Sequence, residues 1–554
     1  MTTDLIARGL AAKTSATVRA STISVEEFGA RTTGNSRMAV QRAIDLAAAN
    51  GIPKVTSRLP RLELWEPLLD DPNGSDLAWL YRNRTLRIPA CDNLDLDFGG
   101  ASVTIKAHTG VGPPLGQPAP NAYGGVWSGG FLTCAGVIRR LRIANVTCDG
   151  GYIGNARAGE NIKVFDKGLY LQDLSDANLG AGNGFGDIIM ENVTLHSFSG
   201  EIMYDNSSRN HLSRDCHFHN SPQSCWNPNG VGKVVAYNVQ AGNSAQPCEI
   251  VGGKGHTYFG GRFYEAGGFG STVIGGPDPG FQAGHAYNFP ARRTDAPPPY
   301  VMFHGTRFED YDNYLYLGSY LRGSIQTTDV PIFIAAAFAS SETLRDIDID
   351  IYATVDRRPG YAAVQVGGAA GNDGSQPNNI NIRIHCGRTN LAQINGRNFA
   401  TGLRIGGFVD PSCTFRVDGY GNSPFSMDTP AVAGSVLPLI DTTGFRQNGN
   451  PDFLYFAADQ TYTVASRSVN LYPTAAGTFN FVLNTAPGYS PDQLFTFHHD
   501  GSGAANRIVS FAQNGAGMKL NATRTLRRAG EYLTLRRAEQ GATWVEHAYL
   551  GQGA

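Results

Sequence analysis

The sequence predicts an all-β protein whose main body is a parallel β-helix, a solenoid in which the chain winds through stacked coils of short strands. Two observations predict this fold class. Short apolar runs alternate with turn-forming residues along the 554-residue chain, which has 68 glycines and only 17% charged residues. Segments of similar sequence also recur about every 23 residues. A repeat of this length, with two or more strands per period, is typical of one solenoid coil.

The repeat has two series of matching segments. Members of the first series start 23 residues apart, at Asn192, Asp215, Asn238 and Gly261, with related segments about two periods away at Asn145 and Thr306. Members of the second series keep the same offset and start at Gly200, Gln223, Gln246 and Phe269. The repeats lack a 10–12-residue stretch of helical periodicity, which excludes an α-solenoid. A β-propeller repeat would be about 40–45 residues long.

Alternation within the second series assigns its side chains to two faces. The residues expected to point inward form two columns: Ile202, Cys225, Cys248 and Ser271, and then Tyr204, Asn227, Ile250 and Val273. The residues expected to point outward are Met203, Trp226, Glu249 and Thr272, with Glu201 and Asp205 on the same face. A slip of one residue would invert this assignment.

The two ends of the solenoid need caps. Residues 36–50 place Val40, Ala43, Ile44 and Ala47 at helical spacing, and this pattern predicts an amphipathic helix that covers the first coil. The expected organisation is an extension over 1–20, a capping segment over 21–59, the β-helix over 60–428 and a C-terminal domain over 429–554. The last region alternates with period two and lacks the repeat, which predicts an antiparallel, sandwich-like β domain.

Composition argues against several functional classes. The net charge is −2 and no basic tract occurs, which argues against nucleic acid as a partner. The sequence lacks an apolar run of about 18 residues, so no membrane insertion is expected, and the first residues lack the apolar core of a secretory signal peptide. The eight cysteines form no CxxC pair and are expected in the core. His217 and His219 share a strand and are expected to be structural, and no metal or cofactor is predicted.

The segment Ile23–Ala30, followed by Ala39–Asp45, resembles the entry motif of the pectate-lyase-like β-helix superfamily, which includes many phage tailspikes and bacterial glycanases. The resemblance covers about 30 residues. Where the superfamily usually carries acidic, glycine-rich residues, this chain has Arg31–Arg37 instead. The resemblance implies a right-handed helix, frequently trimeric, that acts on polysaccharide. It carries over no catalytic residue, because members differ in where their chemistry lies.

Carboxylates on neighbouring coils are the candidates for chemistry. Glycoside hydrolysis needs two carboxyl groups, about 5–5.5 Å apart for retention or about 6.5–9.5 Å for inversion, and stacked coils lie about 4.8 Å apart. We hypothesise that Asp205 and Glu249 form the acid–base pair, with Glu201 as the alternate and Trp226 as a platform for a sugar ring. The alternative is a solvated face of carboxylates beside an incidental tryptophan.

Further candidates lie elsewhere on the coils. We hypothesise that Glu265, about two coils before Asp310, binds substrate together with Asp310 and Asp312; an ordinary charged turn is the alternative. Asp149, before two glycines, is a third candidate or a simple turn. A lyase would need cations to neutralise a uronate, and those available do not form a distinctive pair: Lys163, Lys167, Lys233, Lys254 and Arg262.

The expected function is that of a phage tailspike that binds and hydrolyses a bacterial surface polysaccharide by carboxylate acid–base catalysis. A polysaccharide lyase on the same fold, or a non-catalytic receptor-binding or structural tail protein, is the alternative. The expected assembly is a homotrimer that contacts phage tail or baseplate proteins through its N-terminus. The expected location is therefore the virion tail.

Overall fold

The computed structural model describes most residues from 21 to 551. The longer stretches outside the description are 1–20, 66–83, 107–128, 158–166, 172–184, 267–286, 290–300, 335–343, 369–377, 389–398 and 428–437, and shorter ones occur elsewhere. The chain forms two compact units, Met1–Leu315 and Tyr316–Ala554. This division lies inside the predicted β-helix, and the domain boundary expected at 428 stays a prediction.

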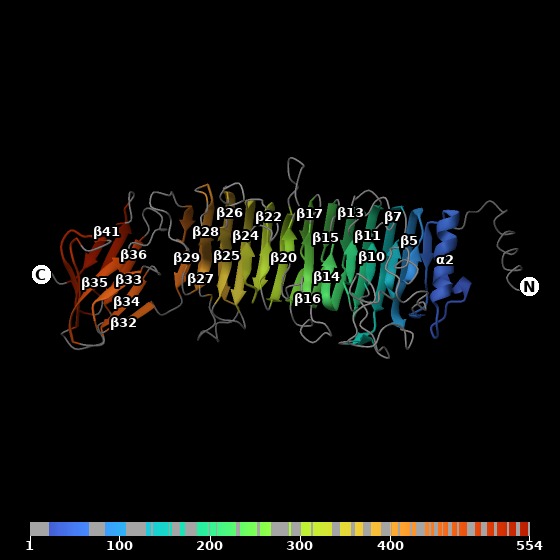
Figure 1. Ribbon diagram of the computed structural model, residues 1–554, viewed down its shortest axis with the longest axis horizontal. Helices are drawn as coiled ribbons and strands as arrows, with labels where there is room; N and C mark the ends of the chain where they lie inside the picture. The colour runs from blue at the N-terminus through green and yellow to red at the C-terminus, as the bar shows by residue number, and fades with distance from the viewer. Residues whose placement is uncertain are drawn as a thin grey trace, which may run out of the picture. The chain divides into compact units, whose positions relative to one another are not determined.

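Each unit contains parallel strands that stack coil upon coil, so the predicted right-handed parallel β-helix is confirmed (Figure 1). The strands that define the coils of the first unit are β5 (Cys91–Lys106), β7 (Ile138–Asp149), β11 (Phe185–His196), β13 (Ser208–Arg214), β14 (His217–Asn227), β15 (Lys233–Tyr237), β16 (Gln240–Val251), β17 (His256–Phe259), β18 (Arg262–Ala266) and β20 (Val301–Tyr311). The strands β6 (Gly129–Cys134), β10 (Leu169–Leu171) and β12 (Met203–Asp205) complete the earlier coils.

The 23-residue repeat sets the register of β11, β14 and β16, whereas β7 pairs directly with β11 at a step of 47 residues and β18 with β20 at a step of 45. Thr194 pairs with His217 and His217 with Gln240, both steps of 23 residues, but Gln240 pairs with Arg262, a step of 22. The predicted alignment of Gly261 with Asn238 is therefore off by one residue. The change begins at an irregularity between Ser221 and Ser224, where the pairing of β14 with β16 shifts.

Left-handed turn residues separate the first two strand segments of each coil. Asn145, Asn192, Asp215 and Asn238 have φ between 50° and 54°, and Gly260 continues the column with φ 62°. Amide groups link the column along the solenoid: Asn192 donates to Asn145 at 3.2 Å and Asn238 donates to Asp215 at 2.9 Å. The residue type follows from this geometry, because Asn, Asp and Gly adopt positive φ most readily.

The predicted faces of the second series are partly wrong. Ile202, Cys225 and Cys248 lie on successive coils and are buried, as predicted. However, Met203 pairs with Trp226 and Trp226 pairs with Cys248, and both Met203 and Trp226 are completely buried. All four residues from Ser224 to Asn227 have no exposed surface. Alternation fails here because this strand is covered on both sides, as parallel strands often are.

Helix α2 (Arg37–Asn50) covers the beginning of the solenoid (Figure 1). Its apolar side buries Val40, Ala43, Ile44 and Ala47, as the helical spacing predicts, and it packs on β4 (Arg84–Ile88) and β5. The side-chain amide of Gln41 donates a hydrogen bond of 2.8 Å to the carbonyl oxygen of Arg87 and accepts one of 2.9 Å from the backbone N–H of Arg87. This amide therefore satisfies backbone groups that an uncovered strand would leave to water.

The second unit also contains stacked parallel coils, and these coils are longer. Ile325 pairs with Ile351, Ile351 with Ile384 and Ile384 with Val417, at steps of 26, 33 and 33 residues. These residues lie on β22 (Leu321–Thr328), β24 (Arg345–Val355), β26 (Asn378–Arg388) and β28 (Thr414–Gly421). A second parallel sheet contains β23 (Ile332–Ile334), β25 (Ala362–Gly368), β27 (Thr401–Gly407) and β29 (Phe425–Met427).

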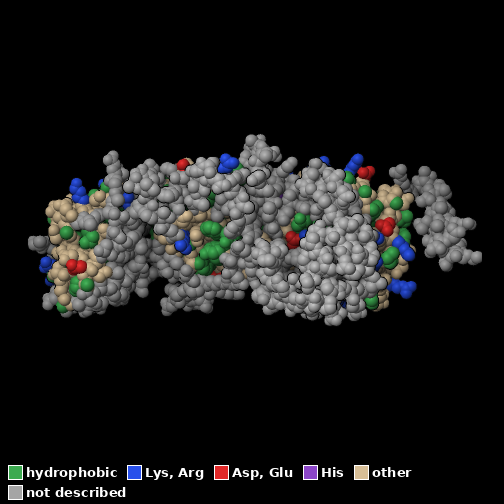
Figure 2. Space-filling model, in the orientation of Figure 1, with side chains coloured by type: hydrophobic (Ala, Val, Ile, Leu, Met, Phe, Trp, Pro, Cys, Tyr) green, Lys and Arg blue, Asp and Glu red, His purple; other side chains and the backbone are tan. Residues whose placement is uncertain are grey.

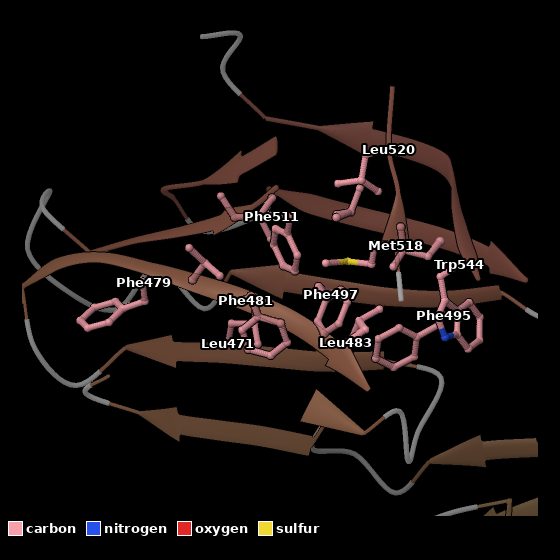
Figure 3. Close-up of a cluster of buried hydrophobic side chains, with 14 residues drawn as sticks. Leu471, Phe479, Phe481, Leu483, Phe495, Phe497, Phe511, Met518, Leu520 and Trp544 are labelled. Carbon is pink, nitrogen blue, oxygen red and sulfur yellow. The ribbon is translucent and has the colours of Figure 1, made fainter. Parts of the chain in front are cut away.

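Two further sheets of the second unit enclose an aromatic core that includes Phe481, Phe495, Phe497, Phe511 and Trp544 (Figure 3). The parallel pairs, which the sequence did not predict, join β32 (Asp452–Phe456), β34 (Ser468–Pro473) and β36 (Leu494–His499), and also β33 (Gln460–Thr463), β35 (Gly477–Asn484) and β37 (Arg507–Phe511). The predicted antiparallel pairing occurs between the later strands, which include β39 (Arg524–Leu526), β40 (Tyr532–Arg537) and β41 (Trp544–Leu550).

The cysteines are core residues, as predicted. Seven are buried and Cys91 is partly buried, and all eight are free thiols. On the face that Figure 2 shows, the described residues include a few charged side chains of both signs. Among the described residues, no helix combines the length and the apolar character that crossing a membrane requires.

Candidate functional site

One outward face of the first unit carries ionisable side chains on successive coils. We call it the histidine–tyrosine face, and it consists of Asp149, His196, His217, His219, Arg262, Tyr264 and Glu309. Parallel pairing stacks its main column in the order Asp149, His196, His219, Gly242, Tyr264 and Glu309. A neighbouring column places His217, Gln240 and Arg262 beside it.

Alternation along short strand segments turns these side chains outward. The segment from His217 to His219 follows the left-handed turn at Asp215 and precedes another at Asn220. Phe218, between the two histidines, is completely buried in the core, so both imidazoles point to the opposite side. They are partly exposed. The face thus arises from the first repeat series and its turns.

The rings on this face contact one another directly. His217 and His219 stack with ring centres 4.3 Å apart, and His219 stacks on His196 at 5.0 Å. A hydrogen bond of 2.8 Å joins His217 Nε2 to the hydroxyl of Tyr264, two coils along. The Asp149 carboxylate lies 3.6 Å from His196 Nδ1. Histidine, tyrosine and carboxylate groups therefore form one continuous polar surface.

Arg262 supplies the positive charge of the face. Its guanidinium lies over the ring of Tyr264, 4.3 Å from the ring centre, and its Nε donates to Glu309 Oε2 at 2.6 Å. The side chains of Arg262 and Glu309 are about one-third and one-fifth exposed, so an anionic ligand could reach the guanidinium. Arginine suits this role, because its planar group binds carboxylates and stacks on aromatic rings.

Burial sets the protonation states of the central pair. Burial lowers the pKa of His217 to about 4, and the neighbouring His219, His196 and Arg262 act in the same direction. Burial raises the pKa of Tyr264 to about 12. Near neutral pH, His217 is therefore a neutral imidazole that can accept a proton, and Tyr264 is a phenol that can donate one. A base and an acid in hydrogen-bond contact are a candidate for proton-transfer chemistry.

The structure places Asp205 inside the solenoid, so its predicted outward position is wrong. The carboxylate has no exposed surface and contacts His211 Nδ1 at 2.6 Å and the hydroxyl of Ser208 at 2.5 Å. His211 Nε2 in turn contacts the hydroxyl of Ser213 at 2.9 Å. This Ser–His–Asp set resembles a hydrolase triad only in its connectivity, because all three side chains are buried where a polymer cannot reach.

Trp226 does not form the predicted platform for a sugar ring. The indole is completely buried, its Nε1 donates to the hydroxyl of Tyr258 at 3.3 Å, and its ring contacts the edge of His211. The outward position predicted for Trp226 is wrong because β14 carries consecutive buried residues. On β12 the alternation is the reverse of the prediction, since Asp205 is buried and Tyr204 is partly exposed. A buried indole contributes packing energy instead of a stacking surface.

Glu201, the predicted alternate acid, is also buried. It forms an ion pair with Lys167 and accepts a hydrogen bond of 2.5 Å from Asn227. The ammonium group of Lys167 lies over the rings of Tyr204 and Tyr170, at 3.6 and 4.9 Å from their centres. Glu249 pairs through its backbone with Tyr287, and its side chain lies outside the described residues. Catalytic roles for Glu201 and Glu249 stay predictions.

Glu265 and Asp310 border the histidine–tyrosine face. They lie on adjacent coils, not on coils two apart as predicted, because β18 pairs directly with β20 despite the 45-residue step between them. Both adopt positive φ, at 50° and 56°, and Glu265 is exposed. Asp312 lies outside the described residues. The substrate-binding role of these acidic residues stays a prediction.

The sequence search missed Tyr264, Glu309 and His196 as members of one site. A signal existed: each lies four residues after a left-handed turn residue, at Gly260, Gly305 and Asn192. The sequence favoured carboxylates of the second repeat series as the catalytic pair, and it did not show that Asp149, His217 and Arg262 of the first series share one face. Among the described residues, no group of three or more histidine, cysteine or acidic side chains could hold a metal ion.

Comparison with known proteins finds likeness only at the level of the fold. No protein-family model matches the chain, and no curated protein matches it by sequence. Among solved structures, the A-module of the mannuronan C-5 epimerase AlgE4 of Azotobacter vinelandii superposes with TM-score 0.41 at 14% identity, over 76% of this chain and 98% of that one. A mutant tailspike protein of E. coli bacteriophage HK620, in complex with a pentasaccharide, superposes with TM-score 0.40 at 12% identity, over 88% and 81%.

Proposed function

We propose that this protein is a tailspike-type enzyme that binds a bacterial surface polysaccharide along the first unit and cleaves it by β-elimination. The observation that carries the proposal is the hydrogen-bonded pair of His217 and Tyr264 beside the guanidinium of Arg262. These three groups supply a base, an acid and a cation on one face of the solenoid, where His217 and Arg262 are partly exposed and Tyr264 is buried. β-Elimination at a uronate requires all three.

The shape of the face suits a long polymer. Stacked coils repeat about every 4.8 Å, so polar side chains recur at that spacing along the column from Asp149 to Glu309. An extended sugar chain that runs along this column can therefore contact several coils at once. A compact ligand would use only part of such a row.

His217 and Tyr264 together accept and return every proton that the proposed reaction moves. His217 removes the proton from the carbon beside the uronate carboxylate, whose charge Arg262 neutralises. The electron pair forms a carbon–carbon double bond as the bond to the leaving glycosidic oxygen breaks, and the phenol of Tyr264 gives its proton to that oxygen. The protonated imidazole then returns a proton to the phenolate across the 2.8 Å hydrogen bond, which restores both groups.

Hydrolysis is the second candidate, and one observation favours it. Glu265 and Asp310 lie on directly paired coils, about 4.8 Å apart at the backbone, so their carboxyl groups can adopt the separation of about 5–5.5 Å that retaining glycosidases use. In this reaction one carboxyl group protonates the glycosidic oxygen and the other attacks the sugar. The exposed position of Glu265 is compatible with such a role.

The test is an assay of the full chain on uronate-containing and neutral capsular polysaccharides. Elimination raises both the number of reducing ends and the ultraviolet absorbance of unsaturated uronates. Hydrolysis raises reducing ends alone. If neither signal rises on any polysaccharide that the protein binds, the protein is a binding module and the proposal of an enzyme is wrong.

Two variants test the assignment of residues. Tyr264→Phe and His217→Gln should each lower kcat by about 10²–10⁴-fold with little change in binding, because each removes one partner of the proton transfer. Tyr352→Phe, which removes the hydroxyl of a half-exposed tyrosine in the second unit, is the matched control and should cleave normally. Equal activity of Tyr264→Phe and the control would contradict the assignment.

The assembly remains part of the proposal. We propose a homotrimer located in the virion tail, with residues 1–20 contacting tail or baseplate proteins and with no cofactor. Sedimentation equilibrium of the full chain should give three times the chain mass of 59.3 kDa. A monomer at micromolar concentration would contradict the proposed trimer, but it would not contradict the proposed reaction.

A further inference from the structure

Gly242 interrupts the main column of the histidine–tyrosine face. It pairs with His219 on one side and with Tyr264 on the other. The remaining members of the column are aspartate, histidine, tyrosine and glutamate, all with side chains that project from the sheet. Gly242 has no side chain, so the column has a gap at this position. The gap lies on the coil between His217 and Tyr264, the proposed base and acid.

The ring of Tyr264 lies in that gap. A Cβ atom built on Gly242 would be 2.4 Å from the carbonyl oxygen of Tyr264 and 2.6 Å from both Cγ and Cδ1 of its ring, all far inside van der Waals contact. The φ of Gly242 is not in the left-handed region, so its torsion angles do not require glycine. Glycine is required here because the Cβ atom of any other residue would collide with Tyr264.

The position of the ring explains how Tyr264 reaches His217. The two residues are 47 positions apart and lie on strands separated by β16, yet their side chains form a hydrogen bond of 2.8 Å. Two coils span about 10 Å. The tyrosine must therefore lean back across β16, and it crosses that strand over Gly242.

We propose that Gly242 is a positioning residue, whose missing side chain lets Tyr264 cross β16 and form the acid–base pair with His217. This inference rests on the proposed function, since it explains how that pair is assembled. The opposing idea is that Gly242 only accommodates the carbonyl oxygen of the neighbouring strand. The two ideas differ in whether the effect of Gly242 depends on the ring of Tyr264.

The first experiment measures Gly242→Ala in the full chain by two readouts. The titration of His217 is followed by NMR with labelled histidine, with the resonance assigned by its loss in His217→Gln. We expect the pKa of His217 to rise toward its ordinary value, because the displaced ring no longer buries the imidazole. Cleavage should fall about 10²-fold in kcat, because the acid is misplaced. The acid limb of the pH profile should move upward with the pKa.

The matched control is Gly387→Ala on β26 in the second unit. There a built Cβ would approach the methyl group of Thr354 at 3.0 Å and otherwise only a backbone oxygen at 3.7 Å, so the same substitution meets no aromatic ring. The control should leave both the titration of His217 and the cleavage rate unchanged. A similar change in the two variants would overturn the proposal.

A double-variant cycle separates the ring from the backbone. Tyr264→Ala removes the ring, so Gly242→Ala should have little further effect on His217 in that background. If Gly242→Ala alone does not fold but the double variant does, the ring is the obstacle and the proposal holds. If the double variant also fails to fold, or if the effects of the two substitutions on the pKa of His217 are additive, Gly242 is needed only to accommodate the backbone carbonyl of Tyr264. The proposal is then wrong. The titration decides this even if the wild-type chain cleaves no polysaccharide, an outcome that overturns the proposed function separately.

Discussion

At the scale of single residues, environment decides what a side chain can do. Asp205 and Asp149 are both strand aspartates of the first unit that contact histidine, but one is buried beside His211 and the other is partly exposed beside His196. Only the exposed arrangement can meet a polymer. A buried polar network instead stabilises the interior when all its members are satisfied, and it is costly to break.

Trp226 provides a test of this distinction. Trp226→Ala should lower the free energy of unfolding by about 3–5 kcal/mol, because it empties a completely buried site. Denaturant unfolding measures the change. The half-exposed Tyr352 is the control, and Tyr352→Ala should cost about 0.5 kcal/mol or less. A normal unfolding midpoint combined with lost polysaccharide binding would instead support the platform that the sequence predicted.

His217 should make stability depend on pH. Its pKa is about 4 in the folded chain, against about 6.5 when unfolded. As the pH falls below about 6.5, the unfolded state binds a proton that the folded state does not take up until about pH 4, so stability is lost across this window. His217→Gln should flatten that part of the curve, measured as unfolding midpoints at several pH values. Parallel curves for the two proteins would show that the histidine is not responsible.

At the scale of elements, the turn column shows why the repeat was readable in sequence. Asn, Asp and Gly recur there because each coil needs a residue at positive φ, and this requirement does not depend on the loops between coils. The fold class and the capping helix followed from such local requirements. The column is therefore the part of the solenoid that the sequence specifies most directly.

Asn238 tests the contribution of this column. Asn238→Ala should destabilise the protein by about 1–2 kcal/mol through strain at its φ of 50°, and by about 0.5–1.5 kcal/mol more through the lost hydrogen bond to Asp215. Asn238→Gly removes the same hydrogen bond without the strain and should cost less. Thermal unfolding of the two variants compares them. Equal losses would mean that backbone strain plays no part.

The candidate site was less predictable than the fold, because it depends on a local shift in register, on burial of one strand on both sides and on a contact between distant side chains. The one-residue shift between Ser221 and Ser224 was not predicted, although Pro222 lies within it and proline in a strand is typical of a bulge. The shift changes the alignment of the coil that follows. Burial of β14 on both sides hides the alternation that would have placed Trp226 inside. The contact between His217 and Tyr264 depends on a ring crossing a strand, which a column alignment cannot show.

At the scale of the whole molecule, the two units use the same pairing with different coil lengths. Steps of 22 and 23 residues predominate around the candidate site, whereas the second unit has steps of 26 and 33. The second unit also contains the aromatic core of Figure 3, which has its own sheets. We therefore expect damage to that core to leave the chemistry of the first unit intact.

Phe497→Ala tests this independence. The ring has no exposed surface and contacts Phe495, Phe481 and Phe511, so its loss should cost about 3–5 kcal/mol. Calorimetry should show a lower transition temperature, while cleavage measured below that transition stays unchanged. Leu494→Ala, at a 43% exposed position on the same strand, is the control. Loss of cleavage well below the transition would show that the units are coupled.

The unequal coil lengths have a consequence for how such a protein changes over generations. Each strand needs only its two neighbours in register, so insertions between strands alter the corners and leave the ladder itself untouched. The loops between strands can therefore change in length and sequence while the stacked strands are kept. A change in these loops then requires no change in the interior, and the two parts can evolve at different rates.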